Sequence, residues 1–238
     1  MAARTYVLVH GAWHGGWCWV RVADRLTAAG HRVVTPTQTG LGERRHLLSA
    51  AVTPDTFIDD IANVIEAEEL SDVILVGHSF GGLAVSGVAD RMPERLRLLV
   101  FLDAGLPESG KSYFEQVTPK VREARIKAAQ ASSGGLSMPP PNAAAFGVTD
   151  PNDAAWVERR LTPHPLATYS LPVLLKHPLG NGVPAIYIRC TDPGYSNIAK
   201  SADDARSRSG WQYLEIATGH DAMITAPTEL TEMLLAVG

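Results

Sequence analysis

The chain has 238 residues, of which 45% are hydrophobic and 19% charged, the balance of a folded globular protein rather than a disordered one. Its 21 basic and 25 acidic residues give a net charge of -4, and no basic or aromatic pattern typical of RNA-binding domains is present, which argues against nucleic acid as a partner. The longest apolar runs, such as 73–76 and 98–102, are far shorter than the ~20 residues that span a bilayer.

The first nine residues, MAARTYVLV, predict a core strand rather than a leader sequence. Their apolar run is too short for a signal peptide, and it continues directly into HGAWHGG. We therefore expect a cytoplasmic protein. The two cysteines, Cys18 and Cys190, form no CxxC pair, so we expect buried free thiols rather than a disulfide framework or a thiolate metal site.

Short β-rich runs alternate with helical patterns along the chain. The runs are apolar on both pleat faces, as in buried parallel strands: Tyr6–Val9, Arg32–Thr35, Val73–Val76, Leu98–Leu102, Ala185–Arg189 and Tyr213–Ile216. Helical patterns cover 17–29, a stretch from Pro54, Gly81–Met92, 197–208 and 226–236. This alternation predicts an α/β fold with a doubly wound, mostly parallel sheet of about six strands.

Two of the helices carry recognisable end signals. Gly30 follows the pattern at 17–29, where a C-terminal cap belongs. Thr53 and Pro54 have the residue types of an N-cap and first turn, and apolar residues follow at helical spacing. Both signals support helices on either side of the second strand.

The segment 106–182 breaks the alternation. It contains no apolar strand of the same kind and only three weak helical patterns, near 112–130, 152–161 and 166–176, with a Gly/Ser/Pro-rich turn region at 132–142. We therefore predict a core domain formed by 1–105 and 183–238, with 106–182 inserted after the fourth strand as a helical lid.

The sequence Gly77-His78-Ser79-Phe80-Gly81 is the strongest chemical signal. It lies between a predicted strand and a predicted helix, which is the context of the G-x-S-x-G nucleophile elbow. The tight turn needs glycines because side chains at 77 and 81 would collide with their neighbours. Ser79 is therefore the predicted nucleophile.

The loop after the first strand, His10-Gly11-Ala12-Trp13, predicts part of an oxyanion hole. Ligands bind beyond the carboxyl ends of such strands, and a small turn there brings a backbone N–H close to the nucleophile. We assign the oxyanion hole to the N–H groups of Ala12 and Phe80. His10 and His14 are four residues apart but not on a helix, so we interpret them as structural hydrogen-bonding residues rather than metal ligands.

A nucleophilic serine needs a base and an acid, expected in the chain order Ser, acid, His. His220 follows the last strand and is the predicted base. Asp192 follows the fifth strand and matches that order, so we take it as the acid, with Asp103, at the end of the fourth strand, as the alternative. Asp221 is too close to His220 in sequence to orient it.

Three motifs, HGAWHGGWCW, GHSFGG and GHDAMITAP, together resemble the α/β-hydrolase fold family. The resemblance is closest to its branch of plant methylesterases, plant hydroxynitrile lyases and bacterial carboxylesterases, including pyrethroid-hydrolysing ones. It covers nearly the whole chain and is weakest in 106–182. It implies that Ser79, Asp192 and His220 form a triad and that Ala12 and Phe80 supply the oxyanion donors.

Two departures from the lyases favour an esterase. The lyases carry a Thr where this sequence has Gly11. They also carry a Lys where this sequence has Asp221, and that Lys supplies positive charge for the leaving cyanide. An acidic residue there disfavours developing negative charge. A serine nucleophile also argues against the dehalogenases and epoxide hydrolases of this fold, which use Asp.

The sequence thus predicts a serine carboxylesterase for a small or medium hydrophobic ester, acting through an acyl-enzyme without metal or organic cofactor. Trp13 and Leu106, beside the predicted strand ends, are the candidate substrate-binding residues. The alternatives are a hydroxynitrile-lyase-like or other C–C bond cleaving enzyme with the same triad, or a non-catalytic small-ligand receptor. The expected partner is a small-molecule ester, with no nucleic acid and no membrane, and a homodimer is left open.

Overall fold

The computed structural model describes residues 2–238, and its centre is a six-stranded sheet in the order β2-β1-β3-β4-β7-β8. All neighbouring strands in it are parallel. Every predicted run is a strand, with ends that differ by at most two residues: β1 (Thr5–Val9), β2 (Arg32–Val34), β3 (Val73–His78), β4 (Leu96–Leu102), β7 (Ala185–Cys190) and β8 (Trp211–Ile216).

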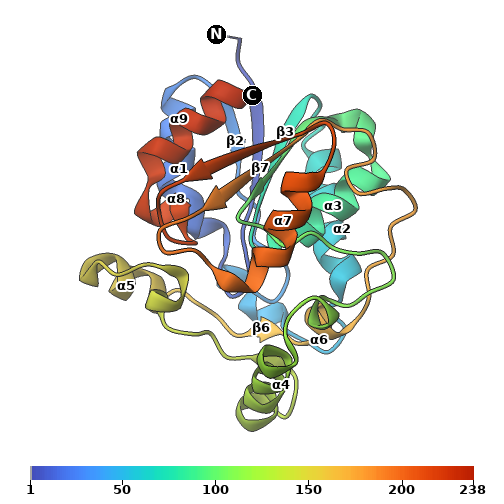
Figure 1. Ribbon diagram of the computed structural model, residues 1–238, viewed down its shortest axis with the longest axis vertical. Helices are drawn as coiled ribbons and strands as arrows, with labels where there is room; N and C mark the ends of the chain where they lie inside the picture. The colour runs from blue at the N-terminus through green and yellow to red at the C-terminus, as the bar shows by residue number, and fades with distance from the viewer. Residues whose placement is uncertain (1) are drawn as a thin grey trace.

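Helices cover both faces of this sheet, as the doubly wound prediction requires. Figure 1 shows one layer of α1 (Val20–Ala28), α8 (Ala222–Thr225) and α9 (Pro227–Val237), and an opposite layer of α2 (Pro54–Ala67), α3 (Gly81–Arg91) and α7 (Ala199–Ser207). Short 3-10 helices occur at Gly16–Trp19, Gly42–Leu47, Pro93–Arg95, Tyr113–Glu115, Ala143–Phe146 and Ser196–Ile198. The first and last of these precede α1 and α7 directly.

The predicted helix ends are confirmed by their hydrogen bonds. Gly30 has φ +88°, and the N–H of His31 reaches back to the carbonyl of Leu26 at 3.1 Å, which closes the C-terminus of α1. Thr53 Oγ1 accepts from the N–H of Thr56 at 3.4 Å and caps α2. Local sequence therefore decides where these helices begin and end.

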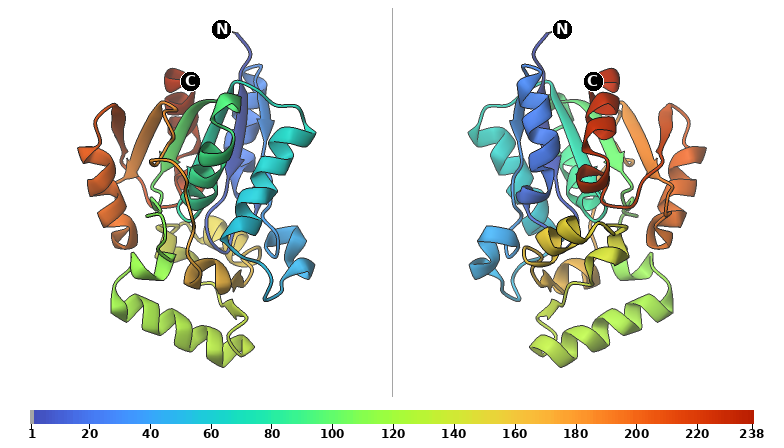
Figure 2. Two further views of the ribbon diagram at one scale, coloured as in Figure 1. Left: turned by 90° about the vertical axis from the view of Figure 1, so that its right-hand side faces the viewer. Right: turned by 90° about the vertical axis from the view of Figure 1, so that its left-hand side faces the viewer.

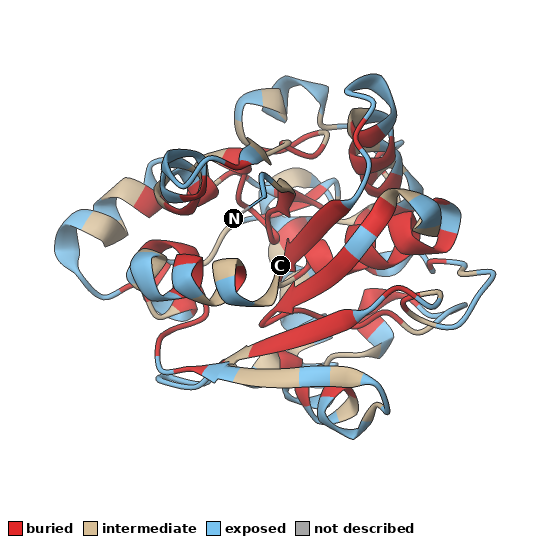
Figure 3. Ribbon diagram, turned by 90° about the horizontal axis from the view of Figure 1, so that it is seen from above, coloured by how far each residue is buried: buried red, intermediate tan, exposed pale blue. Residues whose placement is uncertain are grey.

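Burial falls from the centre of the sheet to its edges (Figure 3). All of β3 is buried, and β4 is buried except at Arg97. The edge strands β2 and β8 are partly exposed. Cys18 and Cys190 are buried free thiols, as predicted. No helix within residues 2–238 combines the length and apolar character needed to cross a membrane.

The segment 106–182 lies along one end of the sheet, with α4 standing furthest from it (Figure 2). It contains α4 (Pro119–Ser133), α5 (Pro151–Glu158) and α6 (Ala167–Ser170), and a two-stranded antiparallel pairing of β5 (Ser137–Met138) with β6 (His164–Pro165). Strands of two residues leave no readable periodicity, which is why the sequence does not reveal them.

The predicted helix at 166–176 is wrong in its length. Only α6 forms, because Leu171 precedes Pro172 and adopts an extended backbone with φ -91° and ψ 146°. A residue before proline is pushed out of the helical region by the proline ring. The predictions at 112–130 and 152–161 correspond to α4 and α5, with shifted ends.

Candidate active site

Ser79 occupies a sharp turn between β3 and α3. It is not a glycine, yet its φ is +53°. A Cβ at Gly77 would lie 2.5 Å from a methyl of Val85, and one at Gly81 would lie 2.8 Å from the carbonyl oxygen of His10. Both positions therefore require glycine, and the turn has the geometry of a nucleophile elbow.

His220 meets Ser79 across this turn. Nε2 of the imidazole lies 2.9 Å from Ser79 Oγ. His220 is in the loop between β8 and α8 and is only 2% exposed, whereas Ser79 is half-buried. The predicted nucleophile and base are therefore brought together with one imidazole nitrogen facing the hydroxyl.

The carboxylate that contacts His220 belongs to Asp103, not to Asp192. Asp103 Oδ2 lies 2.6 Å from Nδ1 of His220. Asp103 directly follows β4, the strand beside β3, and its own N–H donates to the carbonyl of Ile188 at 2.7 Å. The order Ser, acid, His along the chain still holds with this residue.

Asp192 fails to reach the base because its loop folds another way. It lies in a tight turn closed by an antiparallel bridge between Thr191 and Gly194, and its N–H donates to the carbonyl of Thr218 at 3.1 Å. Its side chain is exposed, and among residues 2–238 no hydrogen bond to its carboxylate is found. The order of motifs along the chain could not distinguish two strand ends that both face the same edge of the sheet.

The other oxygen of Asp103 is held from β7. Oδ1 accepts from Arg189 Nη1 at 2.8 Å and from the N–H of Cys190 at 3.1 Å. Asp103 is fully buried, and the cationic partner and backbone donor offset the cost of burying its charge. Arg189 was missed by sequence reasoning, because a lone arginine at a strand end carries no distinctive pattern.

The loop after β1 lies against the nucleophile. A Cβ on Gly11 would come within 2.8 Å of Ser79 Cβ and 3.0 Å of His78 Nδ1. The N–H of Trp13 is directed to Nδ1 of His164 at 3.3 Å. Among residues 2–238, the N–H groups of Ala12 and Phe80 donate no hydrogen bond in a turn or loop, which leaves both available to an oxyanion.

A second buried carboxylate–imidazole pair lies next to this site. His14 Nε2 is 3.0 Å from Asp221 Oδ2, and both side chains are buried. Burial disfavours the charged form of both side chains. The opposite charge and hydrogen bond of the partner outweigh burial in each case, so the pKa of His14 is raised and that of Asp221 is lowered. The two groups form an ion pair.

Two further histidines are neutral and structural. Burial lowers the pKa of His10 to about 3, and its ring bonds the carbonyl of Gly11 at 2.8 Å and the N–H of Gln38 at 3.0 Å. Burial and the neighbouring His220 hold the pKa of His78 well below its usual range, and its Nε2 donates to the carbonyl of His220 at 2.9 Å. No cluster of three or more metal-ligating side chains occurs in the part of the chain that the structure describes.

Aromatic rings surround the reacting groups. Tyr195 stacks on His220 with ring centroids 3.9 Å apart, and Tyr169 stacks on Phe80 at 4.3 Å. Trp13 is 4% exposed, its ring centroid lies 6.4 Å from that of Tyr169, and its role in substrate binding stays a prediction. Tyr169 and Tyr195 come from regions without a motif, and no sequence signal identifies them.

Leu106 faces a different part of the surface. It lines a hollow of about 290 Å³ together with residues of α7, and its N–H donates to Ser201 Oγ at 3.0 Å. This location gives no support to the prediction that Leu106 contacts substrate.

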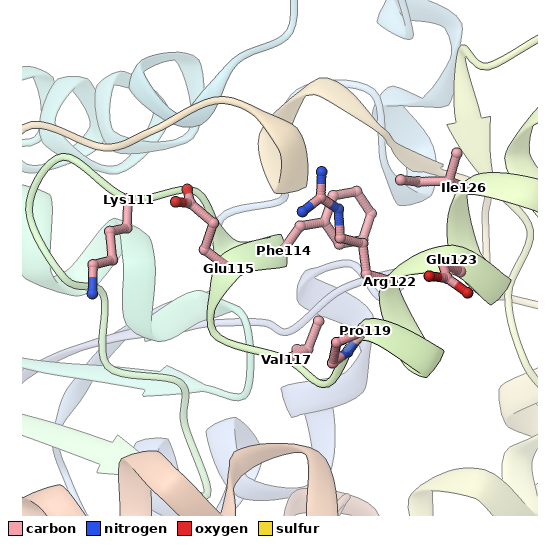
Figure 4. Close-up of a pocket in the computed structure, with 8 residues that line it drawn as sticks. All are labelled: Lys111, Phe114, Glu115, Val117, Pro119, Arg122, Glu123 and Ile126. Carbon is pink, nitrogen blue, oxygen red and sulfur yellow. The ribbon is translucent and has the colours of Figure 1, made fainter.

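A larger hollow of about 700 Å³ opens between the 3-10 helix Tyr113–Glu115 and the first turns of α4 (Figure 4). Its lining is Lys111, Phe114, Glu115, Val117, Pro119, Arg122, Glu123 and Ile126. Phe114 is 3% exposed, and its ring centroid lies 5.4 Å from that of Tyr169. The ring of Tyr169 thus contacts both Phe114, in the wall of the hollow, and Phe80.

Comparison with known proteins agrees with this geometry. A family model described as "Alpha/beta hydrolase family" matches residues 6–233. The chain is 44% identical to a carbendazim hydrolyzing esterase of Nocardioides sp. (strain SG-4G), over 98% of this chain and 99% of that protein. It is also 37% identical to an alpha-hydroxynitrile lyase of Arabidopsis thaliana, but over only 44% of this chain and 41% of the lyase.

The fold is also shared with solved structures. An extracellular alpha/beta-hydrolase from a Paenibacillus species superposes with a TM-score of 0.86 at 24% identity, covering 99% of both chains. At this identity the likeness concerns the fold.

Proposed function

The chain belongs to the alpha/beta hydrolase family, and we propose that it is a serine carboxylesterase whose triad is Ser79, His220 and Asp103. The observation that carries this proposal is the continuous hydrogen-bond chain from Ser79 Oγ through the imidazole to Asp103 Oδ2. The esterase similarity extends over nearly the whole chain.

We assign each group a role from its position in this chain of hydrogen bonds. With Nδ1–H donating to Asp103, Nε2 of His220 is the free acceptor that takes the proton of Ser79 as Oγ attacks the ester carbonyl. The imidazolium then protonates the leaving alcohol. Water, activated by the same nitrogen, hydrolyses the acyl-enzyme. Asp103 stabilises the imidazolium and holds its tautomer throughout.

The oxyanion is assigned to the N–H groups of Ala12 and Phe80. Ala12 follows Gly11, whose backbone approaches Ser79, and Phe80 directly follows Ser79 in the chain. Removing one such donor in other enzymes costs about 3 kcal/mol of transition-state stabilisation. None of these steps requires a metal or an organic cofactor.

The substrate we propose is a small or medium hydrophobic ester. Tyr169 packs against the rings of both Trp13 and Phe80, the residues that follow Ala12 and Ser79, and this aromatic surface favours an apolar or aromatic substrate. We assign segment 106–182 the role of a lid, with the hollow beside Phe114 as the entrance (Figure 4). The name of the Nocardioides relative makes carbendazim one substrate to test.

Neither alternative has the same support. For a lyase, Asp221 is the residue that follows the base, and it is buried in an ion pair with His14 rather than replaced by a cation. For a non-catalytic receptor, the complete hydrogen-bonded triad has no purpose. The cytoplasmic location stays a prediction.

The test is hydrolysis of p-nitrophenyl esters from acetate to decanoate by the native enzyme and by Ser79→Ala. We expect turnover that collapses in the variant, with an optimum at short or medium acyl chains. A folded native enzyme without turnover on any ester would contradict the proposal. Cleavage of a cyanohydrin without an acyl-enzyme would favour the lyase instead.

A further inference from the structure

Arg125 is a cation that lies against two aromatic rings and forms no ion pair with a carboxylate among residues 2–238. It lies on α4, four residues before the buried Ala129, so it faces the core side of that helix. Its guanidinium lies 5.3 Å from the ring centroid of Trp13 and 5.0 Å from that of Tyr169. Nη1 is fully buried and has no hydrogen-bond partner among residues 2–238.

The surrounding groups do not neutralise this charge. Burial lowers the pKa of Arg125, but the nearby phenols of Tyr169, Tyr195 and Tyr113, with a hydrogen bond to Tyr169, outweigh it, so the pKa is raised without any carboxylate. Burial raises the pKa of Tyr169 to about 12 and that of Tyr113 further, so both phenols are neutral at physiological pH. An arginine remains protonated in proteins, so the cation persists.

Nη1 of Arg125 has no acceptor among residues 2–238, whereas the Tyr169 hydroxyl is within hydrogen-bonding reach of the same guanidinium. Rings that contact the face of a guanidinium attract its charge but do not accept its in-plane N–H groups. A buried donor without an acceptor is costly, and the cost is removed when a ligand supplies an oxygen acceptor. A planar fork of donors fits a carboxylate best.

The position of Arg125 fits the remote end of an ester. The guanidinium contacts the ring of Trp13, the residue after Ala12, and the ring of Tyr169, which stacks on the ring of Phe80. Arg125 itself belongs to neither the proposed triad nor the proposed oxyanion hole.

We propose that Arg125 is a specificity residue that binds a second oxygen acceptor, above all a carboxylate, on the ester substrate. This rests on the proposed esterase function and narrows its substrate class. Half-esters of short dicarboxylic acids are the simplest compounds of this kind, with the scissile ester at Ser79 and the free carboxylate at the guanidinium.

The experiment uses three p-nitrophenyl esters with the same acyl skeleton. They are the 5-methylhexanoate, the 5-oxohexanoate and the glutarate half-ester, which end in an isopropyl, an acetyl and a carboxylate group. We expect the native enzyme to have the highest kcat/KM for the half-ester. Arg125→Met should lower the preference for half-ester over 5-methylhexanoate about 10- to 100-fold, mainly through KM.

Two variants on α4 complete the comparison. Arg125→Lys keeps the charge but loses the planar fork, so we expect an intermediate preference. Lys127→Met removes an exposed cation from the same helix and should keep the native preference. If Arg125→Met and the native enzyme rank the three esters alike, the proposal is wrong even though the esterase function stands.

A binding measurement separates the proposal from hydrolysis. Trp13 contacts the guanidinium, so ligand binding to Ser79→Ala can be followed by tryptophan fluorescence with monomethyl glutarate and methyl 5-methylhexanoate. We expect the glutarate to bind more tightly, and this advantage to vanish in Ser79→Ala/Arg125→Met. Equal binding of both esters to Ser79→Ala would overturn the proposal whether or not any ester is hydrolysed.

Discussion

Asp103 Oδ2 lies 2.6 Å from Nδ1 of His220, although the two residues are 117 positions apart in the chain. The contact joins the end of β4 to the loop after β8, across the intervening strand β7. Arg189, at the end of β7, binds the other oxygen of Asp103. The ends of β4, β7 and β8 therefore all contribute to the position of the His220 imidazole.

Replacing Asp103 and Asp192 by Asn, one at a time, identifies which of them is the catalytic acid. Asp103→Asn removes the acceptor that holds the imidazole tautomer, so we expect kcat for p-nitrophenyl butyrate to fall about 10³- to 10⁴-fold. Asp192→Asn alters an exposed side chain and should stay close to native activity. Circular dichroism checks that both variants are folded. The reverse pattern of activities would restore Asp192 as the acid.

Tyr195 covers one face of the His220 ring, at 3.9 Å between centroids. Tyr195→Ala removes the stacked ring and lets the imidazole tilt, so we expect kcat to fall about 2- to 10-fold. Tyr195→Phe keeps the ring, so its rate of acylation should remain close to that of the native enzyme. Single-turnover acylation compares the two variants. Equal losses in both variants would assign the effect to the hydroxyl group instead.

Gly11 makes room for the nucleophile. In Gly11→Ala the new Cβ would lie 2.8 Å from Ser79 Cβ, so the loop carrying the Ala12 N–H must move. We expect kcat/KM to fall about 10- to 100-fold, because a displaced oxyanion donor is only partly lost. The matched control is Gly210→Ala, where the added Cβ meets nothing within 4 Å but φ is +81°. That variant should lose stability and keep its activity.

The His14–Asp221 ion pair makes stability depend on pH. The pKa of His14 is raised above its ordinary 6.5, so its contribution is present below pH 6.5 and is lost as pH rises through the raised value. The pKa of Asp221 is lowered below its ordinary 3.8, so its contribution is present above pH 3.8 and is lost as pH falls through the lowered value. The pair therefore stabilises the fold most between about pH 4 and 6.5.

His14→Gln leaves the charge of Asp221 buried without its partner. We expect Tm to fall by about 5–10 °C at pH 5–6, and the difference from native to narrow as pH rises through the raised pKa of native His14. His46→Gln changes an exposed histidine and should show only a small difference at every pH. A difference for His14→Gln that does not vary with pH would mean that folding does not shift the pKa of His14, which would contradict the ion pair.

Much of this protein follows from its sequence. Short runs that are apolar on both pleat faces predict buried parallel strands, and Thr53 and Gly30 mark helix ends through hydrogen bonds within a few residues. The elbow at Ser79 is readable for the same reason, since its glycines are required by atoms of the turn and its immediate packing. His220 follows from its place after the last strand.

The tertiary structure alone decided the rest. Asp103 and Asp192 both follow strands that end at the same edge of the sheet, and only the strand order and the turn at Thr191–Gly194 place the first against His220 and the second in solvent. The position of Arg125 likewise depends on where α4 lies over Trp13 and Tyr169. Interactions within one turn of chain are encoded locally, whereas contacts between distant segments are decided by how the whole chain packs.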